Sequence, residues 1–493
     1  MKNNRKKNLI FFIVTVLIAS ITYRNFIAIH YSTDMYSIIN EGLKEYAIKN
    51  SFTDGRVFMG IIDIVGYVLN IKPEVYKSIL TIFAILISSI SVIKLKNIIL
   101  KMKSTNNIYV EIVVYIISYC TIFNFIIAEY MYFIESFIIS VAILLIIYAS
   151  DIFISKNKYC YLKSIILCAI SVLCYQATIP FFIALTFTLS TIKNKQKYKN
   201  ILNDLIKSGL IIFIGIIVNI ILVKNMTLIL NTTQSRIEFN IELILYNIKY
   251  ICNNFIWIFN NQCNLYINGL FICIIIGIIF SILNANIENK KTHIINLFLI
   301  IFITVIVNFA MHIPTLSAYY AGRTKFAIGT IIGLLFMYIY LATTIFDSKN
   351  WVSKYTITLL LIYTISIVFV ANILLSYSNK VNKLENESVM EIETYMKNYE
   401  DNNNVEVKNI AIINIYNQKE KSYYREIQNN SVIVQDAVKC DWSADGVINF
   451  YSKRKLRKIQ IQSKNIEEYM LKFENEKDYI CVGDTLIIKT YMY

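Results

Sequence analysis

Charged side chains gather in a few short segments beside long apolar runs. Asp34, Asp54 and Arg56 follow the first apolar run directly, within residues 30–74. A carboxylate can take a proton from a hydroxyl group, and an arginine can hold an anion through two parallel hydrogen bonds. Charged side chains close to lipid are energetically costly, and they usually have a function. The pattern therefore predicts a catalytic site in this loop, with chemistry on a lipid-borne substrate.

Further polar candidates flank three later apolar runs. They are Glu129, Glu135, Tyr175, Gln176, Arg323 and Lys325. The carboxylates and the tyrosine–glutamine pair could bind sugar hydroxyls, and the two cations could bind a lipid phosphate. His312 is one of three histidines and has no partner at ligand spacing. We therefore expect no metal site.

Each main candidate also has a structural interpretation. Asp34 could cap the helix that is predicted to follow it, since Asp is a preferred N-cap residue. Arg56 could extend its aliphatic stem through lipid and keep its charge at the headgroups. Arg323, Lys325 and Tyr175 could be interface anchors, because cations and tyrosines collect there in membrane proteins. The residue types alone leave these alternatives open.

The composition excludes an ordinary soluble enzyme. Of 493 residues, 56% are hydrophobic and 16% are charged, and the mean hydropathy is +0.53. The net charge is +15, but Lys and Arg stand in short clusters between apolar runs, which favours a lipid bilayer over nucleic acid as the partner. The nine cysteines show no metal-binding spacing; Cys440 and Cys481 could pair if the tail lies outside the cell.

Runs of about 20 apolar residues, the length that crosses a bilayer, predict about 11 transmembrane helices. They cover about residues 8–29, 75–93, 107–126, 132–150, 161–175, 178–192, 208–223, 266–284, 294–311, 326–346 and 355–376. Basic residues before the first run predict a cytoplasmic N-terminus. The first run lacks a small-residue cleavage site and should stay as an anchor. Because successive spans cross the membrane in opposite directions, every candidate residue and the C-terminal residues are predicted to lie on the outer side.

The expected fold class is mostly α: a polytopic membrane domain over residues 1–377, followed by a small α+β extracytoplasmic domain over 378–493. Period-two stretches at 409–416 and 485–491 predict strands in that tail, and 385–399 has a helical pattern. In the first outer loop, residues 35–49 and 57–70 have the mixed polarity of surface helices.

Three short elements resemble bacterial membrane glucosyltransferases that modify O-antigen, the Gtr type II family of the GT-C class. They are Asp34 just beyond the first predicted span, Gly55-Arg56 after an amphipathic aromatic segment, and Tyr175-Gln176-Ala177 after a short apolar span. The resemblance implies a GT-C-like fold and a polyprenyl phosphate donor, undecaprenyl phosphate-glucose. It also implies an inverting single displacement onto a cell-envelope glycan at the outer face, with no nucleotide sugar, cofactor or metal.

Within that picture Asp34 is the general base that activates the acceptor hydroxyl. The residues expected to bind the donor phosphate are Arg56, Arg323 and Lys325, and those expected to bind sugar or acceptor are Asp54, Glu129, Tyr175 and Gln176. Two other functions stay open. A lipid-linked oligosaccharide flippase or polymerase would share the span count, and a flippase would carry charges deep within its spans. A non-catalytic envelope scaffold would tolerate Asp34→Asn.

Overall fold

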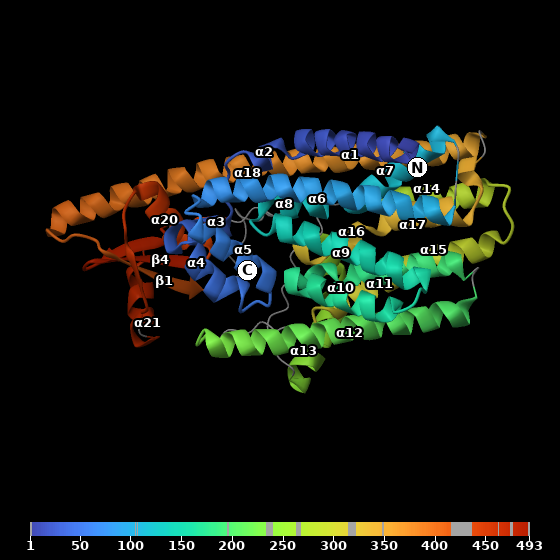
Figure 1. The fold of residues 1–493 in the computed structure, drawn as a ribbon. Coiled ribbons are helices and arrows are strands. Elements are labelled where there is room, and N and C mark those ends of the chain that lie inside the picture. Colours follow the sequence, from blue (N-terminus) through green and yellow to red (C-terminus); the bar gives the residue numbers. More distant parts are fainter. Residues whose placement is uncertain are drawn as a thin grey trace. The chain divides into compact units, whose positions relative to one another are not determined.

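The computed structural model describes residues 2–103, 105, 107–194, 197–232, 240–262, 268–313, 322–347, 350–415, 436–461, 463–473 and 477–491. The chain is mostly helical and forms two compact units (Figure 1). The first unit comprises Met1–Ile27, Ala47–Ile62 and Ile79–Ile373; the second comprises Ala28–Tyr46, Asp63–Ser78 and Leu374–Tyr493.

The helices cover most of the chain. In order they are α1 (Lys2–Thr22), α2 (Arg24–Ile27), α3 (Thr33–Glu41), α4 (Leu43–Tyr46), η1 (Ala47–Ser51), α5 (Val57–Val68), α6 (Pro73–Met102), α7 (Ile108–Ile122), α8 (Ile126–Tyr132), α9 (Ser136–Ser155), α10 (Cys160–Cys174), η2 (Gln176–Thr178), α11 (Pro180–Lys193), α12 (Tyr198–Ile229), α13 (Ile241–Gln262), α14 (Asn268–Asn284), α15 (Lys290–Ala310), η3 (Gly322–Thr324), α16 (Phe326–Gly329), α17 (Ile331–Ala342), η4 (Ile345–Asp347), α18 (Trp351–Asn403), η5 (Ala437–Lys439), α20 (Ala444–Ser452) and α21 (Ser463–Lys472).

Several of these helices can cross a membrane, as the apolar runs predict. Among the described residues, α6, α9, α12, α15 and α18 are long and apolar enough, and α7 with α8 makes a sixth span if that pair, bent by 55°, is counted as one. Shorter apolar helices lie at Val57–Val68, Cys160–Cys174, Gly269–Asn284 and Ile331–Ala342. The chain is therefore a membrane protein, while the number of 11 spans stays a prediction.

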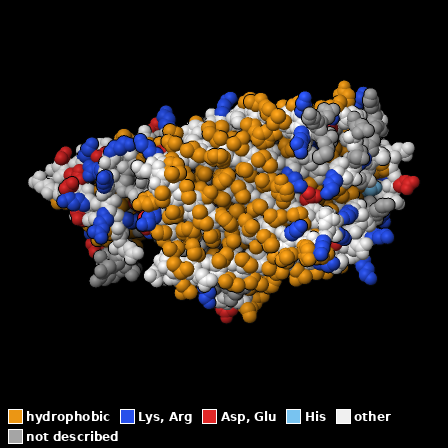
Figure 2. All heavy atoms as spheres, in the orientation of Figure 1, with side chains coloured by type: hydrophobic (Ala, Val, Ile, Leu, Met, Phe, Trp, Pro, Cys, Tyr) orange, Lys and Arg blue, Asp and Glu red, His pale blue; other side chains and the backbone are white. Residues whose placement is uncertain are grey.

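The helices of the first unit turn apolar side chains outward, as lipid-facing helices do. Phe213 of α12 and Phe302 of α15 are more than half exposed. On the face drawn in Figure 2, such side chains form a broad continuous area over this unit. Between helices the contacts use small polar residues: Ser164 and Ser171 of α10 donate hydrogen bonds to carbonyl oxygens of α9. Small side chains let two helices approach closely.

Ion pairs gather where the Lys-rich clusters fall in the sequence. Lys94 lies 2.6 Å from Asp151, and Lys156 lies 3.2 Å from Asp204. Asp151 and Lys156 stand at the C-terminal end of α9, whereas Glu135 is the N-cap of that helix. The 20 residues of α9 span about 30 Å at the α-helical rise. Glu135 therefore lies at the end of α9 opposite to this basic cluster.

The second unit contains a four-stranded sheet in the order β2-β1-β4-β3. Its strands are β1 (Asn409–Ile415), β2 (Arg457–Ile459), β3 (Tyr479–Val482) and β4 (Thr485–Tyr491). Strand β1 runs parallel to β2 and β4, and β3 is antiparallel to β4. The predicted strand at 485–491 is thus found as β4, and that at 409–416 as β1. The helical pattern at 385–399 is the end of α18, which continues unbroken from the apolar segment.

The core of the second unit joins the loop after α2 to the C-terminal residues. Tyr36 of α3 packs in one buried cluster with side chains of α18, of the sheet and of α20. Its hydroxyl donates a hydrogen bond of 2.7 Å to Glu385. Cys440 and Cys481 are buried, free thiols here, so the pairing considered from the sequence is not formed in this structure.

Candidate active site

The turn that carries Arg56 is held by two helices of the first unit. Gly55 has a φ of +77°, a conformation that favours glycine. Gln176 donates a hydrogen bond of 2.9 Å to the carbonyl oxygen of Asp54, and Asn219 of α12 donates one of 2.8 Å to the carbonyl oxygen of Gly55. A Cβ atom at Gly55 would come within 2.8 Å of both amide side chains. The glycine therefore lets two distant amides fix the backbone next to Arg56.

Arg56 sits in a buried, charged environment. Its Nη1 donates to Oε1 of Glu135 at 2.6 Å, and its Nη2 lies 3.8 Å from Oδ2 of Asp54. The side chain of Arg56 is 13% exposed and that of Glu135 only 3%. The Tyr175 ring lies 5.0 Å from the Arg56 guanidinium carbon, a cation–π distance. Burial lowers the pKa of Arg56, but Glu135 and Asp54 raise it by more, so Arg56 stays a cation.

A second cationic group lies beside the first. The carboxylate of Glu129 accepts a hydrogen bond from the backbone N–H of Arg323 and interacts electrostatically with Arg323 and Lys325. Tyr130 donates a hydrogen bond of 2.7 Å to the carbonyl oxygen of Arg323. The rings of Tyr130 and Tyr175 are 6.0 Å apart between centroids, so two adjacent aromatic residues link the Arg323 turn to Arg56.

Several polar atoms of this cluster have no hydrogen-bond partner among the described residues. They are Oε2 of Glu129, Oε2 of Glu135 and Nε of Arg56, all buried. Buried polar atoms in folded proteins are almost always paired, with protein, water or ligand. Two carboxylate acceptors and one guanidinium donor suit a molecule that carries both hydroxyl and anionic groups. The cluster thus has the features of a binding site for a polar ligand.

The structure assembles seven of the eight predicted site residues within the first unit. They are Asp54, Arg56, Glu129, Tyr175, Gln176, Arg323 and Lys325. Asp34 belongs to the second unit, in the first turn of α3. The N-cap of α3 is Ser32, whose hydroxyl accepts from the backbone N–H of Met35. Asp34 is therefore not the capping residue, and that structural interpretation of it is wrong.

Two residues of the site were not predicted from the sequence. Asn219 lies in the middle of the apolar helix α12, and Tyr130 lies on the short helix α8 beside Glu129. A polar side chain within an apolar span is the signal that could have identified Asn219. Glu129 itself lies on α8, not in the open turn expected from hydropathy. Arg236 and Glu238 follow the predicted span at 208–223 and would lie in an outer loop by the same alternation of spans; both are outside the described residues.

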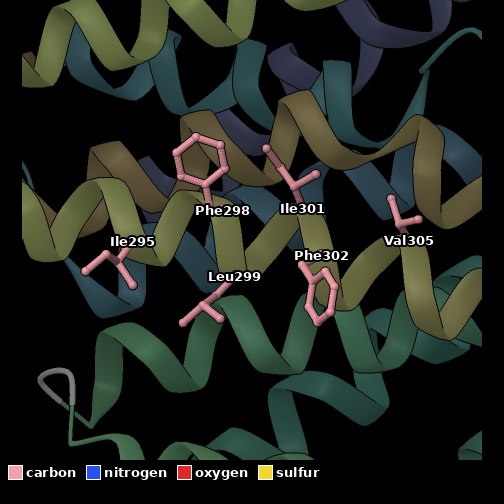
Figure 3. A pocket seen from close by; sticks show the side chains of 6 residues that line it. All are labelled: Ile295, Phe298, Leu299, Ile301, Phe302 and Val305. Carbon is pink, nitrogen blue, oxygen red and sulfur yellow. The ribbon is translucent and has the colours of Figure 1, made fainter.

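On the described part of the chain, neither a metal site nor a hollow between helices is a better candidate. No three His, Cys, Asp or Glu side chains are grouped there as metal ligands. An open hollow of about 530 Å³ lies along α15 (Figure 3), lined by Ile295, Phe298, Leu299, Ile301, Phe302 and Val305. None of these side chains can exchange a proton or bind an anion. The Arg56 and Arg323 cluster is therefore the better candidate for catalysis.

Comparison with known proteins finds a family model that matches part of the chain. Residues 121–340 match the family model described as glucosyl transferase GtrII. The match includes α8, the start of α9, η2 and the Arg323 turn, and thus most of the side chains of the buried cluster. A search among curated proteins finds no match. Residues 121–340 of this membrane protein are thus similar to the GtrII glucosyltransferases.

Proposed function

We propose that this protein moves a glucose unit from a polyprenyl phosphate to a cell-envelope glycan at the outer face of the membrane. The observation that carries the proposal is the buried cluster in which Arg56 and Arg323 lie among Glu129, Glu135 and Tyr175. A membrane protein keeps such charges inside only at a cost, and they typically mark the path or site of a polar substrate.

The proposed step is a single displacement at the anomeric carbon. The acceptor hydroxyl oxygen forms a bond to this carbon while the bond to the phosphate oxygen breaks, so the configuration inverts. Asp34 takes the proton that the hydroxyl loses. Asp34 lies in the first turn of α3, whose N-cap is Ser32. The leaving group is the polyprenyl phosphate, which departs with both electrons of the broken bond.

The cations are proposed to stabilise the leaving phosphate. Negative charge on its oxygens grows in the transition state, and preorganised cations lower the energy of that state most. Arg56, Arg323 and Lys325 are the proposed phosphate ligands. Asp54, Glu129, Tyr175 and Gln176 are proposed to contact sugar hydroxyls, for which carboxylate and phenol oxygens are suitable partners.

The experiment measures transfer of radiolabelled glucose from polyprenyl phosphate-glucose in membranes that contain equal amounts of each variant. The acceptor is polysaccharide released by mild acid from the envelope of the producing cells. We expect Asp34→Asn to lose transfer by at least about a hundredfold, since general bases contribute about 10²- to 10⁴-fold. Asp34→Glu should keep part of the activity because it retains a carboxylate.

The matched control is Glu41→Gln, an acid at the other end of the same helix, which should transfer glucose at the parent rate. Full transfer by Asp34→Asn would refute the assigned base. Absence of transfer by the parent protein, with polyprenyl phosphate-glucose supplied, would refute the proposed donor.

A further inference from the structure

Two observations bring Trp442 close to Asp34 within the second unit. Ser37 donates a hydrogen bond of 2.6 Å to the carbonyl oxygen of Trp442. Asp34 and Ser37 are three residues apart on α3 and so share one face of the helix. Burial raises the pKa of the nearby Cys440 thiol, and surrounding carboxylates, Asp34 among them, raise it further. The segment from Cys440 to Trp442 thus runs past the first turns of α3.

Trp442 is partly accessible to solvent. The residue is 42% exposed, although the residues that follow it, from Ser443 to Ile448, are buried. Large aromatic side chains usually bury most of their surface. Trp442 therefore combines a backbone held against α3 with a part of its surface that a ligand can reach.

Polar side chains hold the residues on either side of Trp442 in the sequence. Asn414 at the end of β1 donates to Oδ2 of Asp441 at 3.0 Å. Lys458 donates to the carbonyl oxygen of Asp441 at 3.0 Å and to Oδ1 of Asp445 at 2.9 Å. These bonds fix the orientation of the residues beside Trp442 before any ligand binds. Sites for polar ligands combine a rigid aromatic surface with a few oriented polar groups.

We propose that Trp442 is the platform on which a pyranose ring of the acceptor glycan stacks, beside Asp34. This inference rests on the proposed function. One face of a pyranose ring carries C–H groups, which the negative face of an indole attracts, while the ring hydroxyls turn to polar neighbours such as Asp441. A ring bound there would bring a hydroxyl of the same or the next sugar toward the Asp34 carboxylate.

The alternative occupant of an exposed tryptophan is the bilayer interface. Tryptophans that enter lipid are accompanied by apolar residues and by cations that meet anionic headgroups. Here the neighbours in sequence are Asp441 and Ser443, and a second acid, Asp445, lies three residues on. This polar and acidic setting favours a sugar over lipid.

Steady-state kinetics give the first test, with acceptor polysaccharide and polyprenyl phosphate-glucose varied separately. Trp442→Ala should raise the acceptor KM about tenfold, the ratio that one aromatic contact can supply, and leave the donor KM unchanged. Trp442→Phe should lie close to the parent. The control is Trp351→Ala, an exposed tryptophan at the start of α18, which should match the parent. An unchanged acceptor KM in Trp442→Ala would overturn the proposal.

Fluorescence gives a second test that does not depend on turnover or on the folding of Trp442→Ala. In the Asp34→Asn background, Trp257→Phe and Trp351→Phe leave Trp442 as the single tryptophan of the chain. We expect released polysaccharide to change the emission of this protein saturably, and brominated lipid in nanodiscs not to quench it. Quenching by brominated lipid without a response to polysaccharide would assign Trp442 to the bilayer.

The two proposals fail in different ways. If the parent transfers no glucose but Trp442 still responds to polysaccharide, the donor or the reaction is wrong and the glycan subsite stands. If the parent transfers glucose and Trp442 does not respond, the subsite is wrong and the reaction stands.

Discussion

Arg56 and Glu135 form a hydrogen-bonded ion pair of 2.6 Å across 79 residues of chain. The pair joins the turn before α5 to the N-cap of α9, and both side chains are largely buried. A buried pair of this kind stabilises the fold only while both partners are present, because one charge left alone in low dielectric is costly. The stability of the fold therefore depends on Arg56, the same residue that is proposed to bind the donor phosphate.

Removing one partner should cost more stability than removing both. We expect Arg56→Leu or Glu135→Leu to lower the free energy of unfolding by about 3 to 5 kcal/mol, and the double variant to recover a good part of this loss. Thermal unfolding in detergent measures the difference. Glucose transfer should stay lost in the double variant, since the phosphate ligand is gone. If the double variant transfers glucose normally, Arg56 is not needed for catalysis.

Gly55→Ala tests the turn that presents Arg56. The new methyl group would meet Gln176 at 2.7 Å and Asn219 at 2.8 Å, and the φ of +77° disfavours any side chain. We expect a loss of about 1 to 3 kcal/mol in stability and a clear fall in transfer. Gly209→Ala on α12 is the matched control, since no atom lies within 4 Å of its new Cβ. If the two variants have equal stability and equal transfer, the turn tolerates a side chain at position 55.

The stability of the first unit should fall in mild acid because of His312. Burial, with a smaller contribution from the charge of Lys325, lowers the pKa of His312 to about 3. The unfolded chain takes up this proton near pH 6.5 and the folded chain does not, so stability is fully present above pH 6.5 and is lost as pH falls toward 3. The slope is at most about 1.4 kcal/mol per pH unit for one proton.

The measurement for this prediction compares melting temperatures of the parent and His312→Gln from pH 7.5 to 4.5. The parent should lose stability more steeply than the variant below pH 6.5. Parallel curves would mean that His312 is protonated in the folded protein.

Gly446→Ala should act on the helix that carries Asp34. A Cβ atom at Gly446 of α20 would lie 2.5 Å from the carbonyl oxygen of Tyr36 on α3, and backbone cannot move as cheaply as the end of a side chain. We expect a loss of about 1 to 3 kcal/mol and reduced transfer, because α3 shifts. Gly269→Ala, with open space around it, is the control. Normal transfer by Gly446→Ala would show that the position of α3 is not critical.

The helices and two of the strands could be predicted because their signals are local. An apolar run of about 20 residues marks a span wherever it packs, and period-two alternation marked β1 and β4. The sequence alone did not show that the helical pattern at 385–399 continues a span, since a change from apolar to charged residues looks the same at a domain boundary. Here the backbone of α18 simply continues, because nothing between Lys380 and Glu385 ends a helix.

The candidate site was predictable in its residue types but not in its contacts. Hydropathy is one-dimensional: it located Arg56, Glu129, Tyr175 and Arg323 beside apolar runs. The resemblance to the glucosyltransferases agrees with the family model that matches residues 121–340. Which charges meet depends on distances in space, so the bond to Glu135 and the role of Asn219 appeared only in the structure.

The sequence by itself determined a membrane protein of helical spans with a polar tail. Only the tertiary structure decided that α3, which bears Asp34, packs in one core with α18, α20 and the sheet. The physical reason is that burial selects a partner for each apolar face after the local elements exist. Tyr36, for example, packs in this core and donates a hydrogen bond to Glu385, some 350 residues further along the chain.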